Sequence, residues 1–155
     1  MPNLVLCRVD QRLIHGQVLT QWLKYVGANL IVLANDEISN DSLRQSLMNV
    51  AVPNGVQTRY FNLQKTIDII HKAADHQKIL LLVQTIEDAH TLILNGVPIK
   101  ALNIGNIHLE NDRVSLNDYV ALSAREHELL LNLIQKDIEV YLQRVPSEPK
   151  SPYKP

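Results

Sequence analysis

The stretch "KILLLVQ", residues 78–84, holds five apolar residues in succession, Ile79 to Val83. A strand with one face in water alternates apolar and polar residues, whereas an uninterrupted apolar run indicates a strand covered on both faces. Further strand candidates lie at 3–9, 28–35, 55–61 and 100–105, with weaker ones near 118–122 and at 138–145. We therefore predict a largely parallel sheet with both faces covered.

Amphipathic stretches alternate with these strands. Their apolar residues recur at the spacing of one helix face. Three such stripes are Val18, Leu19, Trp22, Leu23 and Val26; Leu43, Leu47, Val50 and Ala51; and Leu63, Ile67, Ile70 and Ala74. A fourth helix is signalled at "SAREHELLLNLIQK", where Ser123 and Glu126 have the spacing of a capping box. This alternation predicts a single three-layer α/β domain, an open sheet with helices on both faces.

Length and composition limit what this domain can do. A chain of 155 residues fits one domain, which we place at 1–145, followed by a loose, proline-rich tail without core-forming residues, "PSEPKSPYKP", at 146–155. The formal net charge is −1, so no global basic field recruits nucleic acid and any anion binding must be local. The single cysteine, Cys7, lies in an apolar run, which suits a reducing cytoplasm. Neither a signal peptide nor a membrane-spanning run is expected.

Charge gathers at one place, in "RVDQRLIHGQV" at 8–18, directly after the first strand. Ligands of parallel sheets bind where strands end and helices begin. Arg8, Asp10 and Arg12 alternate, so they can point to one side, and the two guanidiniums could form a cradle for a phosphoryl group. The free N–H groups of the following helix would add to this anion site. Asp10 could bind one ring nitrogen of His15 and leave the other nucleophilic.

Other interpretations of these residues remain open from the sequence. His15 could simply cap a helix or bind a neighbouring carbonyl, and the arginines could form surface ion pairs. A regulatory module that binds an anion without chemistry would use the same loop. The face around Trp22 and Tyr25 could instead bind a partner protein, although core or rim packing is the simpler role for these residues.

Two further loops follow strands, "AND" at 34–36 and "NIGN" at 103–106, and could meet the first loop over one sheet edge. Gly105 could serve only a turn. Neither a metal site nor a cofactor is predicted, since no metal-ligand spacing, nucleophile elbow, P-loop or dinucleotide fingerprint is present. The remaining histidines are interpreted as solvated helix or loop residues: His71, His76, His90, His108 and His127.

The signature at 8–18 closely resembles that of the IIB components of the mannose–fructose–sorbose family of the bacterial phosphoenolpyruvate-dependent sugar phosphotransferase system. The similarity extends to "IVLANDEISND" (31–41), "NGVPIKALNIGN" (95–106) and "EVYLQRVPSEP" (139–149). The resemblance implies a mostly parallel sheet with one antiparallel edge strand. It also implies that His15, through Nδ1, accepts a phosphoryl group from the phosphohistidine of the IIA component. The group then passes to a sugar imported by the IIC and IID membrane components.

The same resemblance assigns roles to individual residues. It matches Arg8, Asp10, Arg12 and Asp36 to the family's site residues. The position of Gly16 at the helix start adds it to this expected phosphate-binding set. Gly16 lacks a side chain, which would let a partner's backbone come close. The expected docking rim is Asn35, Gly105 and Asn106.

"NIGN", "MPNLVL" and "ANDE" resemble the N-acetylgalactosamine/galactosamine branch, in which Asn106 replaces a glycine common elsewhere. Other branches handle mannose, sorbose, fructose or glycan disaccharides. A cytoplasmic protein, attached peripherally to the inner face of the membrane through IIC and IID, is expected. It would bind no nucleic acid and could be a homo-oligomer.

Overall fold

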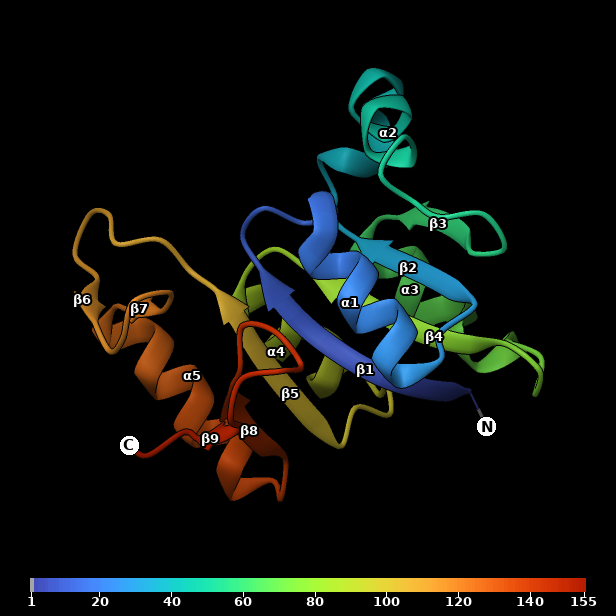
Figure 1. Cartoon of the computed structure of the whole chain (residues 1–155). Coiled ribbons are helices and arrows are strands. Elements are labelled where there is room, and N and C mark those ends of the chain that lie inside the picture. The colour runs from blue at the N-terminus through green and yellow to red at the C-terminus, as the bar shows by residue number, and fades with distance from the viewer. Residues whose placement is uncertain (1) are drawn as a thin grey trace.

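A computed structural model describes residues 2–155. Within them, seven strands form one sheet in the order β3-β2-β4-β1-β5-β8-β9 (Figure 1). All neighbouring strands are parallel except the last pair, β8 and β9. The strands are β1 (Asn3–Asp10), β2 (Leu30–Ala34), β3 (Gln57–Phe61), β4 (Lys78–Val83), β5 (Ala101–Asn106), β8 (Glu139–Leu142) and β9 (Ser151–Pro152).

The apolar run that predicted a doubly covered strand is β4, at the middle of the sheet between β2 and β1. Leu81 is in register with Cys7 on one side and with Val32 on the other. Alternate residues of β4 enter two different apolar clusters: Leu81 joins one, while Leu80 joins the other. The strand is therefore buried on both faces, as predicted.

Helices cover both faces of the sheet, which confirms the three-layer prediction (Figure 1). Leu19, Trp22 and Leu23 of one helix enter one cluster, whereas Ile86 and Leu130 of two others enter the opposite one. The helices are α1 (Gly16–Val26), α2 (Ser42–Asn49), α3 (Leu63–Ile69), α4 (Ile86–Leu94) and α5 (Ala124–Gln135), with short 3₁₀ turns η1 (Ile38–Asn40) and η2 (Ile70–Lys72). No helix among residues 2–155 is long and apolar enough to cross a membrane.

Side chains cap the starts of α5, a predicted helix, and α4, a helix that was not predicted. The capping box of α5 forms as predicted, with the Ser123 hydroxyl accepting from the Glu126 N–H and the Glu126 carboxylate accepting from the Ser123 N–H. Helix α4 was not among the predicted stripes. Its start is nonetheless marked by Thr85, whose hydroxyl accepts a hydrogen bond from the Asp88 N–H.

One predicted helix forms but leaves most of its apolar stripe exposed. Residues 43–51 do contain a helix, α2, but none of its residues is buried. The strand predicted near 118–122 forms over two residues only and lies outside the seven-stranded sheet. It contributes β7 (Ala121–Leu122), which pairs with β6 (Val114–Ser115) in a separate antiparallel ribbon.

The prediction of a loose tail at 146–155 is wrong. Ser151–Pro152 form β9, which pairs with β8 and is the antiparallel edge strand that the family resemblance implied. Tyr153 is only 6% exposed and packs in the larger core cluster, where its ring lies against His127. Strand pairing with β8 and the burial of Tyr153 together hold a segment that otherwise consists of prolines and polar residues.

Candidate active site

The loop between β1 and α1 presents His15 at the edge of the sheet. Leu13 adopts a left-handed backbone conformation (φ 59°), and its side chain is almost fully buried together with that of Ile14. This sharp turn places His15 directly before α1 as its N-cap residue. The imidazole makes no capping bond, and the first turn of α1 contains no acidic residue. The amide N–H groups at the helix start therefore remain able to bind an anion beside the ring.

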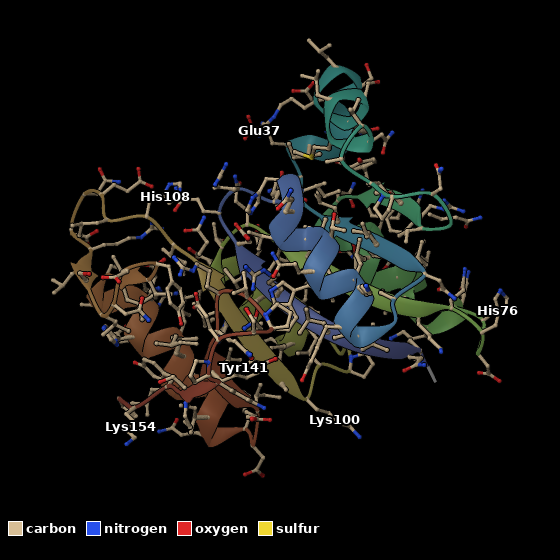
Figure 2. All side chains as sticks on the ribbon, in the orientation of Figure 1. Glu37, His76, Lys100, His108, Tyr141 and Lys154 are labelled. Atoms are coloured by element: carbon tan, nitrogen blue, oxygen red, sulfur yellow. The ribbon has the colours of Figure 1, made fainter. Side chains whose placement is uncertain are left out.

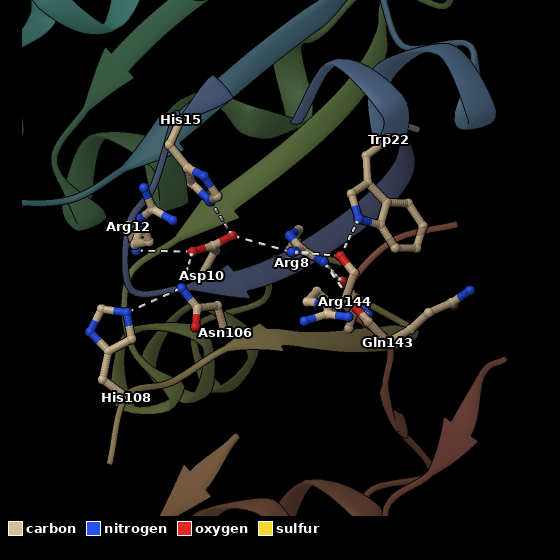
Figure 3. Close-up of polar contacts among 10 residues, drawn as sticks. Arg8, Asp10, Arg12, His15, Trp22, Asn106, His108, Gln143 and Arg144 are labelled. Atoms are coloured by element: carbon tan, nitrogen blue, oxygen red, sulfur yellow. Dashed lines mark hydrogen bonds and ion pairs between the residues drawn. The ribbon is translucent and has the colours of Figure 1, made fainter. Parts of the chain in front are cut away.

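The imidazole of His15 is held by Asp10. Its Nε2 lies 2.9 Å from Oδ2 of Asp10, and the side chain is 16% exposed (Figure 3). The Arg12 backbone N–H donates to the other carboxylate oxygen at 2.9 Å. Within residues 2–155, Nδ1 of His15 makes no hydrogen bond. A carboxylate that accepts from Nε2–H leaves the Nδ1 lone pair as the nucleophilic position of the ring.

Asp10 is ionised despite its burial. Desolvation alone raises the pKa of this carboxyl. The hydrogen bond with His15, the charge of Arg8 and the Arg12 N–H together outweigh that effect, so the pKa lies below its ordinary value. The site thus keeps a fixed negative charge on the side of the imidazole ring that faces away from Nδ1.

Arg8 is placed differently from the prediction. Its side chain is 1% exposed and lies beneath Asp10 instead of forming an open cradle. Four N–H···O contacts at 2.6–3.2 Å use its two terminal nitrogens. The acceptors are Asn103 Oδ1, Gln143 O, Asp10 Oδ2 and Arg144 O. The guanidinium also lies over the Trp22 ring, 5.4 Å from its centroid. These contacts leave no two-pronged face for a phosphate.

Gly105 explains how Arg8 fits. A Cβ at this position would lie 2.1 Å from the Cζ atom of Arg8, so only glycine lets the guanidinium lie against the β5 backbone. Gly105 belongs to β5 and does not have the positive φ that turns favour. The interpretation of Gly105 as a turn residue is therefore wrong: its absence of a side chain makes room for the buried arginine.

Arg12 and Gly16 lie at the open side of the site. The Arg12 side chain is exposed, and within residues 2–155 it forms no ion pair. Gly16 is also exposed and has a φ of 41°, a value that side-chain-bearing residues rarely adopt. No atom lies within 4 Å of a Cβ built there, so the backbone conformation, not crowding within the chain, requires glycine.

The second predicted loop, after β2, reaches the first one through a glutamine that sequence reasoning missed. Asn35 Nδ2 donates to Gln84 Oε1, and Gln84 Nε2 donates to the backbone oxygen of Gln11. Gln84 is the first polar residue after the apolar run of β4, which is the signal that could have found it. Asp36 instead accepts from the Leu63 N–H at the start of α3, and none of its hydrogen bonds reaches His15.

The third loop meets Asp10 through Asn106. Its Nδ2 lies 3.4 Å from Asp10 Oδ1 and 3.3 Å from Nε2 of His108 (Figure 3). Of the three residues predicted as a docking rim, Asn35 and Gly105 are buried, and only Asn106 is partly accessible. Two histidines interpreted as solvated instead link elements: His90 bonds Asn132, and His127 contacts the Tyr153 hydroxyl.

Gln11 connects the segment after β5 to the loop between β1 and α1. Its Oε1 accepts from the His108 N–H and from Arg113 Nη1. Arg113 in turn makes a two-pronged pair with Glu126, the residue of the α5 capping box. Sequence reasoning did not single out Gln11, Arg113, Asn103 or Gln143, because each acts through a partner at least 13 positions away.

The fold and the site define an α/β protein in which a partly exposed histidine, held by a buried carboxylate, lies at the start of a helix that follows a central strand, an arrangement suited to a phosphoryl carrier. The comparisons agree with this class. The model of the family described as "PTS system sorbose subfamily IIB component" matches residues 4–155. The chain belongs to this family of phosphotransferase-system IIB components.

Individual relatives cover almost the whole chain. It is 44% identical over 149 residues to N-acetylgalactosamine-specific phosphotransferase enzyme IIB component 2 of Escherichia coli (strain K12), covering 96% of this chain and 95% of that one. The solved structure of the N-acetylgalactosamine-specific IIB component 1 from Escherichia coli superposes with a TM-score of 0.95 at 35% identity, covering 98% of this chain and all of that one. The sorbose-permease IIB domain from Klebsiella pneumoniae gives 0.91 at 30% identity, covering 97% and 93%.

Proposed function

We propose that His15 carries a phosphoryl group, which it accepts from the phosphohistidine of a IIA component and passes to a sugar. The observation that supports this most directly is the orientation of the imidazole. Nε2 is bound to the buried carboxylate of Asp10, and Nδ1 is the ring nitrogen left for attack at the start of α1. This orientation agrees with the Nδ1 position that the family resemblance implied.

In the first transfer, Nδ1 of His15 attacks the phosphorus and forms a new P–N bond while the P–N bond to the donor histidine breaks. The proton on Nε2 stays in place, and the Asp10 carboxylate stabilises the positive charge that develops on the ring. The Arg12 guanidinium and the N–H groups at the start of α1 face the moving phosphoryl group and balance its negative charge. Arg8 acts indirectly, because it holds Asp10 from below.

In the second transfer, a sugar hydroxyl attacks the phosphorus, the P–Nδ1 bond breaks, the imidazole returns to its neutral form and the hydroxyl proton passes to water. We propose N-acetylgalactosamine or galactosamine as the sugar, since relatives at 44% and 36% identity are named N-acetylgalactosamine-specific IIB components. Membrane IIC and IID components would deliver it. The protein would then work in the cytoplasm at the inner face of the membrane, as a protein-phosphohistidine–sugar phosphotransferase.

The experiment compares His15→Ala with His108→Ala, a matched removal of an imidazole from the same edge. Each protein is incubated with phosphoenolpyruvate, the general phosphotransferase proteins and IIA, and acid-labile phosphate is counted. We expect no incorporation in His15→Ala and incorporation close to wild type in His108→Ala. Phosphate on the His15→Ala protein would contradict the proposal, and anion binding without covalent incorporation in wild type would favour a regulatory module.

The sugar is tested separately with pre-phosphorylated protein and membranes that carry the cognate IIC and IID components. Phosphoryl transfer should be faster to N-acetylgalactosamine or galactosamine than to mannose. The reverse order would contradict the sugar assignment while leaving the role of His15 untouched.

A further inference from the structure

The side-chain amide of Gln11 lies between a cation and an anion. Its Oε1 accepts from Arg113 Nη1 at 3.2 Å and from the His108 N–H at 2.9 Å. Its Nε2 donates to the carboxylate of Glu110. The donors on one side and the carboxylate on the other determine which way the amide lies, and they require a side chain that both donates and accepts. A hydrocarbon side chain would satisfy neither partner, and a carboxylate would repel Glu110.

The cluster that receives this amide is itself fixed to the body of the protein. Arg113 makes a two-pronged ion pair with Glu126, with N···O distances of 3.0 and 3.1 Å. The same carboxylate completes the capping box of α5, a helix whose Leu130 is completely buried. The Gln11 side chain therefore joins the loop that leads to His15 to a firmly packed helix.

The peptide unit between Gln11 and Arg12 is held at both of its polar atoms. Its oxygen accepts from Gln84 Nε2 at 3.2 Å. Its N–H, which belongs to Arg12, donates to Asp10 Oδ1 at 2.9 Å. The exposed Arg12 side chain, by contrast, forms no ion pair within residues 2–155. The direction in which its guanidinium leaves the loop is therefore set by the backbone that Gln11 anchors.

We propose that Gln11 is a positioning residue of phosphoryl transfer, which holds the loop so that the Arg12 guanidinium faces the phosphoryl group on His15. This inference rests on the proposed function, because it assumes that Arg12 meets that group. A charged group stabilises the transferring phosphoryl only while its position is kept, and a displacement of about 1 Å can cost up to about 100-fold in rate. The bonds of the Gln11 side chain lead to the segment after β5, so its effect on the reaction passes through Arg12.

The test compares Gln11→Met with Gln77→Met, because methionine keeps the length of the side chain and removes the amide. Gln77 is a matched control: it is also partly buried, and its Oε1 also accepts from a backbone N–H, that of Ala74. Figure 2 shows His76, the neighbour of Gln77, on the opposite side of the molecule from His108. At saturating IIA, phosphorylation of Gln11→Met should be slower by at least about 3-fold with an unchanged KM for IIA, while Gln77→Met should react like wild type.

Two kinetic outcomes would overturn the proposal. A wild-type rate in Gln11→Met would show that the anchor does not matter to the reaction. A raised KM for IIA with an unchanged kcat would show that Gln11 serves to bind the donor protein and does not position a group for the transfer step.

A double-mutant cycle tests whether the effect passes through Arg12. In an Arg12→Met background, Gln11→Met should cost little further rate, because the group that it positions is already gone. An equal loss of rate in both backgrounds would overturn the proposal, since Gln11 would then act through another group.

A second pair of variants tests the hydrogen bonds themselves. Gln11→Glu should slow transfer, because the new carboxylate faces that of Glu110 and has no proton to donate. Gln11→Glu/Glu110→Gln exchanges donor and acceptor and keeps the net charge, so the double variant should regain most of the wild-type rate. A folded double variant as slow as Gln11→Glu alone would contradict the proposal.

Amide hydrogen exchange follows the loop without any phosphate chemistry. The Arg12 N–H, bound to Asp10, should exchange faster in Gln11→Met than in wild type or in Gln77→Met. Equal exchange in all three proteins would overturn the anchoring role of Gln11. Failure of wild type to be phosphorylated at His15 would instead count against the proposed function, since the exchange measurement does not depend on it.

Discussion

The floor and the rim of the site use arginine in opposite ways. We call the buried residues Arg8, Asn103 and Gly105 the floor of the site. The rim, as distinct from the docking rim predicted above, consists here of the more accessible Arg12, His15 and Gly16. Arg8 is almost completely buried, and its terminal nitrogens have four oxygen partners. Arg12, four residues further along, is exposed and forms no ion pair within residues 2–155. An arginine with its partners built in belongs to the structure, whereas one left open is available to a transient anion.

Replacement of Arg8 should have the largest effect on folding. Arg8→Met leaves Asp10, Asn103 and two backbone oxygens without their buried partner. Removal of one partner from a buried ion pair costs about 3–5 kcal/mol of unfolding free energy, and denaturant titration measures it. Arg125→Met removes an exposed arginine paired with Glu128 at 3.7 Å and serves as the control, with little expected change. Similar small losses in both variants would contradict the distinction between floor and rim.

Gly105→Ala should be the next most damaging change, by about 1–3 kcal/mol, since the added methyl overlaps the Arg8 guanidinium. The matched experiment repeats Gly105→Ala in an Arg8→Ala background, where the overlap is gone. The two changes should then be clearly non-additive, with Gly105→Ala costing much less in the second background. Equal costs in both backgrounds would show that Arg8 is not what requires glycine here.

Asp10 contacts both Arg8 of the floor and His15 of the rim. Its contribution to the unfolding free energy depends on pH. Its folded pKa is lowered, so its stabilising contribution is fully present above the unfolded value of about 3.9. The contribution is lost as pH falls through the folded pKa. The difference in unfolding free energy between wild type and Asp10→Asn should therefore be constant near neutral pH and shrink below about pH 4. A difference that stays constant into acid would argue against the lowered pKa.

Arg12→Met should have the smallest effect on folding, within about 0.5 kcal/mol, because its side chain is exposed. It should nevertheless slow phosphorylation by IIA by roughly 10-fold or more, through the loss of a charged contact worth about 1.5–3 kcal/mol. The phosphorylation rate of Arg12→Lys should lie between those of wild type and Arg12→Met, since lysine keeps the charge and loses the planar fork. Wild-type transfer rates in both variants would remove Arg12 from the reaction.

Much of the fold could be predicted because the apolar runs are short and unambiguous. The run in β4 identified a strand buried on both faces, and the spacing of Ser123 and Glu126 identified the start of α5. The tail was mispredicted because local composition says nothing about the pocket that receives Tyr153. The apolar spacing within residues 43–51 indicated a helix but not the direction of its apolar face, which depends on whether another element covers it.

The site was predictable in its residues and less so in their roles. The cluster of charges at a strand end located His15 and Asp10, and the structure brings them within hydrogen-bonding distance. Arg8 and Arg12 look alike in the sequence. What separates them is the space beside Gly105 and the oxygens of Gln143 and Arg144, more than 90 positions away. Burial of this kind is a tertiary property that local spacing does not encode.

The most direct test of the account is to identify the nitrogen that carries the phosphate. The protein is labelled with ¹⁵N-histidine, phosphorylated through IIA and examined by long-range proton–nitrogen correlation NMR, which distinguishes the two ring nitrogens. We predict that only His15 changes, with phosphate on Nδ1 and a proton retained on Nε2 beside Asp10. Phosphate on Nε2 of His15, or on another histidine such as His108, would contradict it.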